Sequence, residues 1–441
     1  MRKGFLIMLA VVLVAAMAAT AMADTNVAGY YRAKGHVGNY ANYGTPVIAA
    51  DQSTGSYVEH RLRAKIGVGD ENVRAYYFAE FDQMWGDSTA GVARGSGGAL
   101  GADSINLETK NMYVWFKLPN TSFDFTVGLS SVFDSYAWIL FGADMSGVTT
   151  TFKVDPATFR AGAYKFFEGD VAEADDVDFY IAEAKLAPMK DVKVGLNLYF
   201  LRSGRGSIGA APALAAADTG SVKVYTPGID FSAKAGPASL TGFAFFQTGK
   251  VQNIGAADVD ISAFAGDLRA DMNVGPGKAF VEGLYISGGD NNAAKYKSIV
   301  GAADWASTQV FYNRSGMQIL FPNTDAINTA VPLSINYSNG GRGLYHIAAG
   351  YSQKLGDRIS GKVGAGYLSA TKLLLVTDST RKGKGMGTEV NATVEYNISK
   401  GLDFGVSGAY AWLGDFFKSN VAGAVDPDNA YDLYAKINYA F

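Results

Sequence analysis

The chain has 441 residues, no cysteine, three histidines and a formal net charge of −3. This balance gives no reason to expect a nucleic-acid partner, and zero cysteine excludes disulfide scaffolds, thiolate metal sites and cysteine nucleophiles. His36, His60 and His346 are not spaced as zinc ligands or as part of a catalytic triad, so we expect neither a metal site nor an enzyme.

Residues 1–23 have the pattern of a cleaved signal peptide. Arg2 and Lys3 precede an apolar run at residues 5–19, and Ala21 and Ala23 frame a small-residue cleavage site. The run is shorter than the ~20 residues that a membrane-spanning helix needs. We therefore expect an exported protein whose residues 24–441 form one domain.

A period-two alternation begins directly after this segment, over residues 27–37, 57–68 and 72–82. Between residues 57 and 68, for example, apolar side chains at Val58, Leu62 and Ile66 alternate with charged ones. Only a β-strand separates side chains in this way. Eleven residues at ~3.3 Å each and a tilt of about 40° rise roughly 27 Å, the height of an outer-membrane apolar band. A soluble β-sandwich also alternates, but a second sheet would not cover so charged a face, which favours a closed antiparallel transmembrane β-barrel.

The connections between the expected strands alternate between short and long. Gly, Pro, Asn and Asp clusters of turn type lie at residues 69–72, 118–121, 155–158, 187–191, 236–238, 274–277, 355–358 and 398–402. Longer segments lie at residues 37–56, 83–104, 130–147, 168–176, 201–221, 248–258, 288–343, 369–387 and 413–430. Together they predict about 18 strands, with both termini at the end of the barrel that carries the short, periplasmic turns. Residues 288–343 contain short alternating pieces, so they could be a loop, fold into the lumen or hold an extra hairpin, which leaves 16 or 20 strands open.

The polar face of the first three strands is the expected pore lining. It carries Arg32, Lys34, Glu59, Arg61, Arg63, Lys65, Arg74, Glu80 and Asp82. Inward charges of a barrel face water and set the field of the pore. Six bases against three acids predict a sector that attracts anions; a lumen whose charges cancel is the alternative. Glu389, Glu395 and Asp432 are expected on an opposing acidic wall.

The third long segment, residues 130–147, is unusually apolar for an external loop. We expect it to fold into the barrel and constrict it, with Asp134 and Asp144 facing the basic side chains. The strand at residues 177–187 is ambiguous, because Glu183 falls on the same face as Phe179.

Two tryptophans test the assignment of the outward face. Trp115 and Trp412 are both expected there, at the depth of an aromatic girdle.

The charged loops and one glycine motif suggest no cofactor. The acidic run at residues 168–178 lacks the spacing of a calcium loop, and it and the basic residues 381–384 are expected to contact lipopolysaccharide. A GxGxxG match at residues 204–209 is not within a βαβ unit, so no dinucleotide is expected.

The last strand, at residues 431–441, alternates outward through Leu433, Ile437 and Tyr439 and ends on Phe441. With this ending, the chain resembles Gram-negative outer-membrane porins over essentially its whole mature length. The resemblance implies an outer-membrane location, contact with outer-membrane lipid and lipopolysaccharide, and an assembly signal at Tyr439 and Phe441 for the barrel-assembly machinery. It also makes a homotrimer an option. Residues 108–120 are more weakly similar to large specific channels such as alginate-export barrels.

These observations predict a passive diffusion channel for small hydrophilic solutes, with a local preference for anions. One alternative is a substrate-specific channel for an anionic saccharide or organic acid. Another is a structural barrel that sheaths an electron-transfer protein and conducts little by itself.

Overall fold

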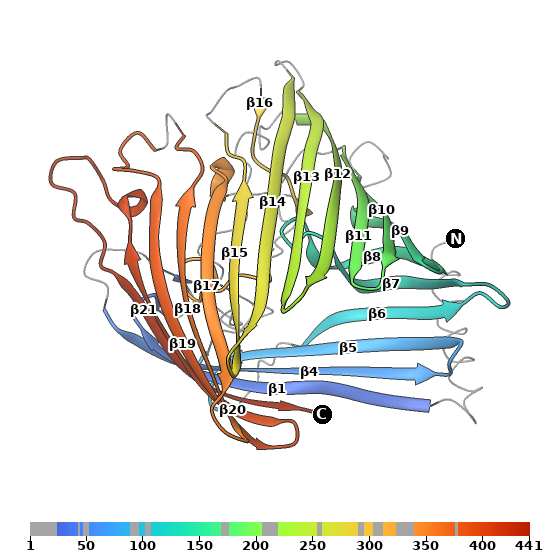
Figure 1. Cartoon of the computed structure of the whole chain (residues 1–441), viewed down its shortest axis with the longest axis horizontal. Helices are drawn as coiled ribbons and strands as arrows, with labels where there is room; N and C mark the ends of the chain where they lie inside the picture. The colour runs from blue at the N-terminus through green and yellow to red at the C-terminus, as the bar shows by residue number, and fades with distance from the viewer. Residues whose placement is uncertain are drawn as a thin grey trace.

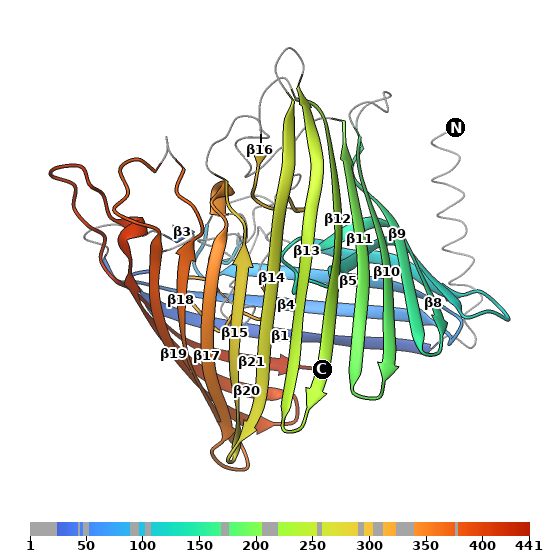
Figure 2. The same ribbon diagram turned by 45° about the horizontal axis from the view of Figure 1, so that its top comes forward.

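The computed structural model describes residues 24–42, 45–46, 53–88, 97–101, 107–168, 176–204, 219–253, 258–289, 295–302, 312–322, 339–374 and 378–441. These residues form an antiparallel β-sheet that curls until its first and last strands meet (Figures 1 and 2). The expected signal peptide, residues 1–23, lies outside the described residues. No helix among the described residues is long and apolar enough to cross a membrane.

Eighteen long strands make up the wall. They are β1 (Asp24–Gly38), β4 (Gly55–Gly69), β5 (Val73–Met84), β6 (Leu107–Lys117), β7 (Phe123–Phe133), β8 (Gly142–Val154), β9 (Ala157–Phe167), β10 (Val177–Met189), β11 (Val192–Ser203), β12 (Thr219–Ala235), β13 (Ala238–Asn253), β14 (Val259–Val274), β15 (Gly277–Ile286), β17 (Leu344–Lys354), β18 (Ile359–Ala370), β19 (Gly385–Ser399), β20 (Leu402–Leu413) and β21 (Ala430–Ala440). The small elements are β2 (Ala41–Asn42), β3 (Thr45–Pro46), β16 (Lys295–Tyr296) and the 3-10 turns η3 (Asn339–Gly341) and η4 (Asp415–Phe417).

The barrel closes where β21 pairs with β1, in a register that sets Tyr439 opposite Tyr31 and Lys436 opposite Lys34. The carboxyl-terminal residue continues this seam, because the backbone N–H and C=O of Phe441 each bond to Gly29 at 3.0 Å. Closure leaves no free sheet edge, which is the condition for a sheet to exist in hydrocarbon.

All eight predicted turns connect neighbouring strands, and each of the nine predicted long segments lies between two wall strands that follow one another in the sheet. Figure 2 shows the short turns that join β10 to β11, β12 to β13 and β14 to β15 at the bottom of the view. The open question about residues 288–343 is settled by pairing: β15 bonds directly to β17, so the segment between them adds no hairpin to the wall. The prediction of 18 strands is confirmed.

The outward face of the strands is apolar. Val363, Val394 and Leu433 are each about half exposed, whereas the side chains next to them in sequence point inward. In water these outward β-branched and aromatic side chains would remain exposed. The outward face therefore suits a hydrocarbon surrounding. Trp412 lies on this face as expected, with 48% of its surface exposed.

Trp115 contradicts the prediction, because it points inward. A β-bulge between β5 and β6 sets Ala79 opposite Thr109 but Phe78 opposite Asn111, which leaves Lys110 unpaired. The extra residue inverts the phase of β6, so Tyr113 and Trp115 share the inner face. Tyr113 confirms the inversion, since its hydroxyl accepts a 2.8 Å bond from the inward Lys65.

Candidate pore and its constriction

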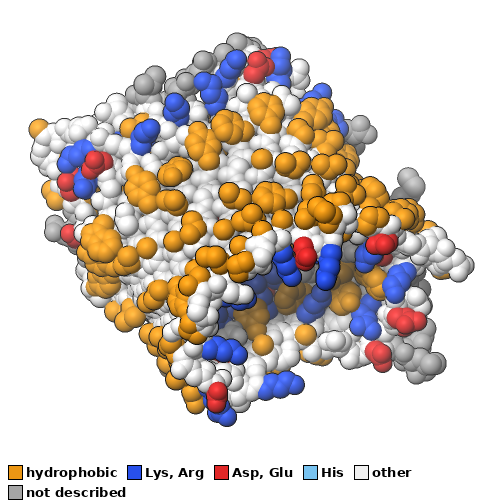
Figure 3. Space-filling view, viewed as in Figure 1, with side chains coloured by type: hydrophobic (Ala, Val, Ile, Leu, Met, Phe, Trp, Pro, Cys, Tyr) orange, Lys and Arg blue, Asp and Glu red, His pale blue; other side chains and the backbone are white. Residues whose placement is uncertain are grey.

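The first three wall strands bring the predicted pore-lining residues together on one inner face. Arg32 lies opposite Arg61, and Lys34 lies opposite Glu59. Across the next pair of strands, Arg61 lies opposite Asp82 and Arg63 opposite Glu80. We call the six cations of this face the basic strip: Arg32, Lys34, Arg61, Arg63, Lys65 and Arg74. In Figure 3, Lys and Arg side chains gather in a hollow of the molecule, while hydrophobic side chains spread over the surface around it.

Two arginines of the basic strip are neutralised by acids of the next strand. Arg61 donates two bonds to Asp82, at 2.6 and 2.7 Å, and its guanidinium is 3.1 Å from Glu80. Arg63 donates to the other oxygen of Glu80. Bidentate pairs of this kind hold both partners in place, so these two arginines offer little charge to a solute.

The two lysines of the strip lie over aromatic rings. The ammonium of Lys65 is 4.4 Å from the centre of the Tyr76 ring, and that of Lys34 is 4.8 Å from the centre of the Tyr434 ring. A ring face stabilises a cation without cancelling its charge. These ring contacts hold both ammonium groups against the inner wall.

Arg32 and Arg74 differ from the other arginines of the strip. Neither forms an ion pair with any residue that the structure describes, and each has a buried guanidinium nitrogen, Nη2 of Arg32 and Nε of Arg74, without a hydrogen-bond partner there. Because these two nitrogens are buried, a solute does not reach them, and any contact with an anion involves another part of the guanidinium. The strip thus combines two arginines held in ion pairs with two that form none among the described residues, although Arg74 lies near enough to the turn residue Asp70 to help lower the pKa of that carboxyl, after two backbone N–H groups.

A first segment, residues 134–141 between β7 and β8, folds into the barrel; we call it the inner loop. Asp134 organises it by accepting four backbone N–H bonds of 2.7–2.8 Å, from Tyr136, Trp138, Leu140 and Phe141. The prediction that Asp134 faces the basic side chains is wrong, because both of its oxygens are committed to its own loop. Four charge-assisted bonds to one carboxylate fix the loop in a single shape.

The inner loop packs against the wall on the side of β10, β11 and β13. The ring centre of Tyr136 is 5.3 Å from that of Tyr199 and 4.7 Å from that of Phe245, and Phe141 is 4.9 Å from Phe179. Phe179 on β10 is therefore buried although it points inward. The ambiguous phase of this strand has a physical cause: its inner face meets a packed loop instead of water.

Charged residues complete the contact between β10 and the inner loop. Glu183 accepts bonds from Tyr199 at 2.7 Å and from Ser135 at 3.2 Å, and Arg160 of β9 donates to both of its oxygens at 2.7 Å. A carboxylate is buried among apolar residues only where hydrogen bonds or ion pairs compensate for its lost hydration. Glu183 therefore belongs to the inner face, together with Phe179.

Asp144, the second acid expected in the constriction, lies on β8 rather than in the loop. It accepts bonds from Lys110 at 2.7 Å, Asn111 at 2.8 Å and Ser131 at 2.6 Å. Lys110 is in turn 4.0 Å from Glu80. Asp144 is therefore linked to Glu80 through Lys110, the bulge residue. It does not contact the arginines of the basic strip directly.

A second segment, residues 312–322, also lies inside the barrel; we call it the crossing segment. At one end Arg314 pairs with Asp267 of β14, and the Gly316 N–H donates to Glu282 of β15 at 2.9 Å. Further along, the Gln318 side chain donates to Asp432 of β21 at 3.0 Å. Since β14 and β21 lie apart in the wall, the segment crosses the interior.

Glu389 of β19 holds the crossing segment as Asp134 holds the inner loop. It accepts the backbone N–H groups of Gln318, Ile319 and Leu320, at 2.5, 2.9 and 2.9 Å. The expectation of an open acidic wall is wrong for Glu389 and Asp432, because both are buried under this segment. Glu395 lies further toward the short turns and pairs with Lys436 at 2.8 Å.

The two inward segments meet on the β10–β15 side of the barrel. Asn313 of the crossing segment donates a backbone bond to Ala137 of the inner loop at 3.0 Å, and Ala302, which belongs to neither segment, donates one to Leu140 at 2.8 Å. Gln247 of β13 ties in the same region by bonding both backbone groups of Val300. The inner loop thus covers the inner face of β10, β11 and β13 with packed aromatic side chains, whereas the basic strip lies on β1, β4 and β5.

A charged cluster around Asp378 joins three of the long connections. Arg342 donates to both of its oxygens at 2.6 and 2.7 Å, and Arg381 donates to one at 2.7 Å. The guanidinium of Arg381 also lies 3.9 Å from the centre of the Phe416 ring. The Arg342 and Arg381 guanidinium groups, with a backbone N–H, hold the pKa of Asp378 at about 2, despite burial that opposes this.

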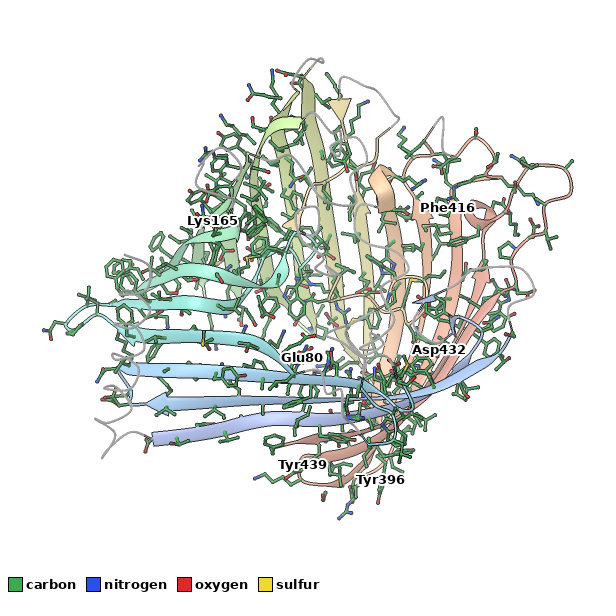
Figure 4. The ribbon with its side chains drawn as sticks, turned by 180° about the vertical axis from the view of Figure 1, so that it is seen from behind. Glu80, Lys165, Tyr396, Phe416, Asp432 and Tyr439 are labelled. Atoms are coloured by element: carbon green, nitrogen blue, oxygen red, sulfur yellow. The ribbon has the colours of Figure 1, made fainter. Side chains whose placement is uncertain are left out.

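Figure 4 shows Phe416 among the long connections, and Tyr396 and Tyr439 close together at the short-turn end. Tyr439 and Phe441, the predicted assembly signal, point outward and are each about 45% exposed. Their role in assembly stays a prediction.

Some cations of the interior escaped sequence reasoning. Arg269, Arg314, Lys362 and Lys436 also line the interior, although only Lys436 lies in a strand whose inner face the sequence had assigned. Arg314 lies in the segment of uncertain role, and no local pattern predicts a cation that acts from a loop. No group of three His, Asp or Glu side chains among the described residues could hold a metal ion.

Comparison with known proteins supports the fold and nothing finer. No family model matches the sequence, and no curated protein matches it. Among solved structures, the chain is similar to the outer membrane protein OpdK of Pseudomonas aeruginosa, with 11% identity over 95% of this chain and 98% of that one and a TM-score of 0.53. Pseudomonas aeruginosa OccK2 (OpdF) matches at 9% identity, 95% and 98% coverage and a TM-score of 0.57. OpdL of the same organism matches at 10% identity, 95% and 99% coverage and a TM-score of 0.55.

Proposed function

We propose that the chain is an outer-membrane channel through which small hydrophilic solutes diffuse passively, with a preference for anions. The observation that carries the proposal is the contrast between the two faces of one closed wall. The outer face is a band of exposed apolar side chains, and the inner face carries Arg32 and Arg74, which form no ion pair with any residue that the structure describes. A closed barrel with this division suits a lipid surround outside and water inside.

The location follows from the same argument. The fold is shared with an outer membrane protein of a Gram-negative bacterium, and the expected signal peptide and carboxyl-terminal aromatic residues are consistent with export and barrel assembly. We place the short turns in the periplasm and the long connections outside, where residues 381–384 could meet lipopolysaccharide. The described basic residues there are partly engaged already, since Lys382 lies 3.0 Å from Asp426.

A substrate-specific channel is the second candidate. The observation that favours it is the pair of inward segments, which bond to each other and reduce the open cross-section of the barrel. A narrowed path brings solutes into contact with the wall, so that one solute class can bind and saturate the channel.

Planar-bilayer recording of the purified protein tests the proposal. We expect stable open-channel steps in KCl, and faster swelling of reconstituted vesicles in small anionic solutes than in cations of the same size. A barrel that sheaths a partner protein would show negligible conductance by itself and would contradict the proposal. A saturable block by one solute class would favour the second candidate.

A further inference from the structure

The outward faces of β9–β14 carry a row of charged side chains near the strand ends that lie opposite to the short turns. Its members are direct register partners from one strand to the next, and we call them the outer charged row: Lys165, Asp178, Arg202, Lys223, Lys250 and Asp260. The row points outward, because Arg202 and Lys223 are exposed whereas their sequence neighbours Leu201 and Val222 are buried on the inner side. Figure 3 shows several Lys and Arg side chains along the upper edge of the hydrophobic outer surface.

The middle of the outer charged row consists of three cations with no acid between them. Lys223 on β12 is the direct partner of Arg202 on β11 and of Lys250 on β13. Neighbouring strands are about 4.8 Å apart, so the three residues span about 10 Å of the surface. Like charges directly opposite each other destabilise a sheet. An anion that bridges the three cations would relieve this repulsion.

The acids that flank the three cations do not neutralise them. Asp178 is already held by Lys165 at 2.7 Å, and it lies 3.6 Å from Arg202. At the other flank, Asp258 and Asp260 lie 3.6 and 3.9 Å from the Lys250 ammonium. These longer distances exceed the length of a hydrogen bond. Lys223 forms no ion pair with any residue that the structure describes.

A belt of aromatic rings lies next to the three cations, on the side of the short turns. Tyr180, Phe200 and Tyr225 are the next outward residues of β10, β11 and β12, and their rings stack with centres 5.9 and 4.6 Å apart. Outward aromatic side chains of a barrel mark the level at which hydrocarbon gives way to lipid headgroups. The three cations lie about 7 Å further along the strands, which places them at the level of the headgroups.

On the other side of this belt, the outer wall is hollowed by a depression of about 770 Å³. Small side chains of β8–β10 lie between larger apolar ones: Thr150, Ala161, Ala182 and Ala184 have Phe123, Phe152 and Phe159 on one side and Leu196, Leu198, Pro227 and Ile229 on the other. A hydrocarbon chain that lies over the small residues would contact the larger ones on both sides.

The depression and the three cations are one lipid leaflet apart at most. Leu198 and Leu196 are four and six residues from Arg202 along β11, which corresponds to about 13–20 Å along the strand. With a strand tilt of about 40°, the depth is about 10–15 Å, within one leaflet of a hydrocarbon core about 30 Å thick. A soluble anion would use only the cations, and an apolar molecule only the depression, whereas a lipid with phosphate groups and acyl chains engages both.

We propose that this outward face binds a phosphorylated glycolipid of the outer leaflet, the lipid A part of lipopolysaccharide. One phosphate bridges Arg202, Lys223 and Lys250, and one acyl chain lies in the depression. A phosphate carries nearly two negative charges and three acceptor oxygens, so that it suits several neighbouring cations. The site is distinct from residues 168–178 and 381–384, the loops expected from the sequence to contact lipopolysaccharide. It goes beyond the channel function and uses only the membrane orientation proposed with it.

The test is the binding of lipid A to the purified protein in detergent, measured by native mass spectrometry. The two probes are lipid A with both phosphates and the same lipid after their removal. For the wild-type protein we expect the phosphorylated lipid to bind at least about tenfold more tightly. Equal affinities for the two lipids would overturn the proposal. Displacement of lipid A by an equal concentration of inorganic phosphate would also overturn it, because it would indicate a site for a soluble anion.

A triple variant tests the cations. Arg202→Gln, Lys223→Gln and Lys250→Gln combined should weaken the binding of phosphorylated lipid A by about tenfold or more and leave that of the dephosphorylated lipid unchanged. The matched control removes three exposed lysines at the short-turn end: Lys190→Gln, Lys234→Gln and Lys400→Gln. It changes the net charge equally and should leave both affinities unchanged. An equal loss in the two triple variants would contradict the assigned site.

A filling substitution tests the depression. Ala182 is exposed on the outward face, where an apolar side chain suits the surrounding hydrocarbon, so Ala182→Phe should fold. The new ring occupies the depression and should weaken the binding of both lipids by about fivefold. Ala392→Phe, on the outward face of β19 opposite Val363, is the control and should change neither. Unchanged binding in Ala182→Phe would remove the acyl-chain seat.

Failure of this inference and failure of the proposed function give different results. If the protein conducts but shows no preference for phosphorylated lipid A, the channel stands and the lipid site falls. If the protein binds phosphorylated lipid A as expected but does not conduct, the lipid site stands and the channel falls.

Discussion

Two buried carboxylates, Asp134 and Glu389, accept hydrogen bonds from loop backbone rather than from cations. Each holds a different inward segment, and each does so with three or four N–H groups. Inward segments carry backbone polar groups into a partly apolar interior, where unpaired donors are costly. One carboxylate can satisfy several donors at once, which explains why acids are placed at these two positions.

Asp134→Asn should loosen the inner loop without unfolding the barrel. The amide replaces one accepting oxygen by a donor, so at least two buried N–H groups lose their acceptor, at about 1–3 kcal/mol each. Single-channel recording should show larger current noise and more frequent substates than in the wild-type protein. Asp144→Asn is the matched control, because Asp144 contacts side chains of the wall only; equal noise in both variants would refute the assigned role of Asp134.

Arg61 and Arg32 lie opposite each other but should respond differently to substitution by Gln. Arg61→Gln leaves Asp82 buried without its bidentate partner and removes one of the two arginines beside Glu80, which should lower the free energy of unfolding by about 3–5 kcal/mol. Arg32→Gln removes a cation that has no acid partner and should change it by less than about 0.5 kcal/mol. Urea unfolding in detergent measures both, and similar losses in the two variants would show that the ion pairs do not distinguish these arginines.

At the scale of elements, the inner loop is an insertion in a hairpin that could close without it. Phe133 and Gly142 are direct register partners at the ends of β7 and β8. Replacing residues 134–141 by Asn-Gly should therefore leave a two-residue hairpin of favoured type. The aromatic side chains that narrow the interior would be absent, so we expect a higher single-channel conductance with the barrel intact. Unchanged conductance would mean that the inner loop does not bound the conducting path.

The Asp378 cluster should make the long connections sensitive to strong acid only. The pKa of Asp378 in the folded protein is about 2, below its ordinary value of about 3.9. A depressed pKa means that the stabilisation is fully present above about pH 4 and is lost as the pH falls through 2. Protease cleavage within residues 371–384 should therefore stay constant from pH 7 to 4 and increase when samples are exposed to pH 2 before digestion.

Asp378→Asn should show the increased cleavage at neutral pH. Asp426→Asn, which affects only the exposed pair with Lys382, is the control. Cleavage that rises already at pH 5 in the wild-type protein would contradict this account of the cluster.

The sequence predicted the wall well because membrane strands obey one simple rule. Alternation, turn clusters and the aromatic ending determine the strand number, the turns and the seam between β21 and β1. Trp115 was misplaced because a bulge needs an unpaired residue, here Lys110, that no periodicity reveals. A sequence pattern therefore does not predict which face of the barrel a residue lies on after a bulge.

The interior was less predictable, because its charges are assigned by contacts between distant segments. That Arg61 and Arg63 lie beside acids could be read from strand register alone. That Asp134 and Glu389 bind loop backbone could not, since the partners of Glu389 lie about 70 positions earlier in the chain. The uncompensated state of Arg32 appears only once all neighbouring strands are placed.

At the scale of the whole molecule, the inner wall differs from one side of the barrel to the other. The inner loop packs aromatic side chains against β10, β11 and β13, whereas the basic strip lies on β1, β4 and β5, beside the seam with β21. A solute that passes would therefore travel along the seam, past the cations that lack acid partners. The chain as a whole is slightly negative, so any anion preference would come from this local arrangement and not from net charge.

The reversal potential in a tenfold KCl gradient tests this central claim most directly. With wild-type protein in a planar bilayer, we expect a reversal potential of the sign that indicates preference for chloride, and a shift toward zero when Arg32→Gln and Arg74→Gln are combined. Lys400→Met should leave the value unchanged. A wild-type reversal potential that indicates preference for potassium, or a value that the double variant does not move, would contradict the account.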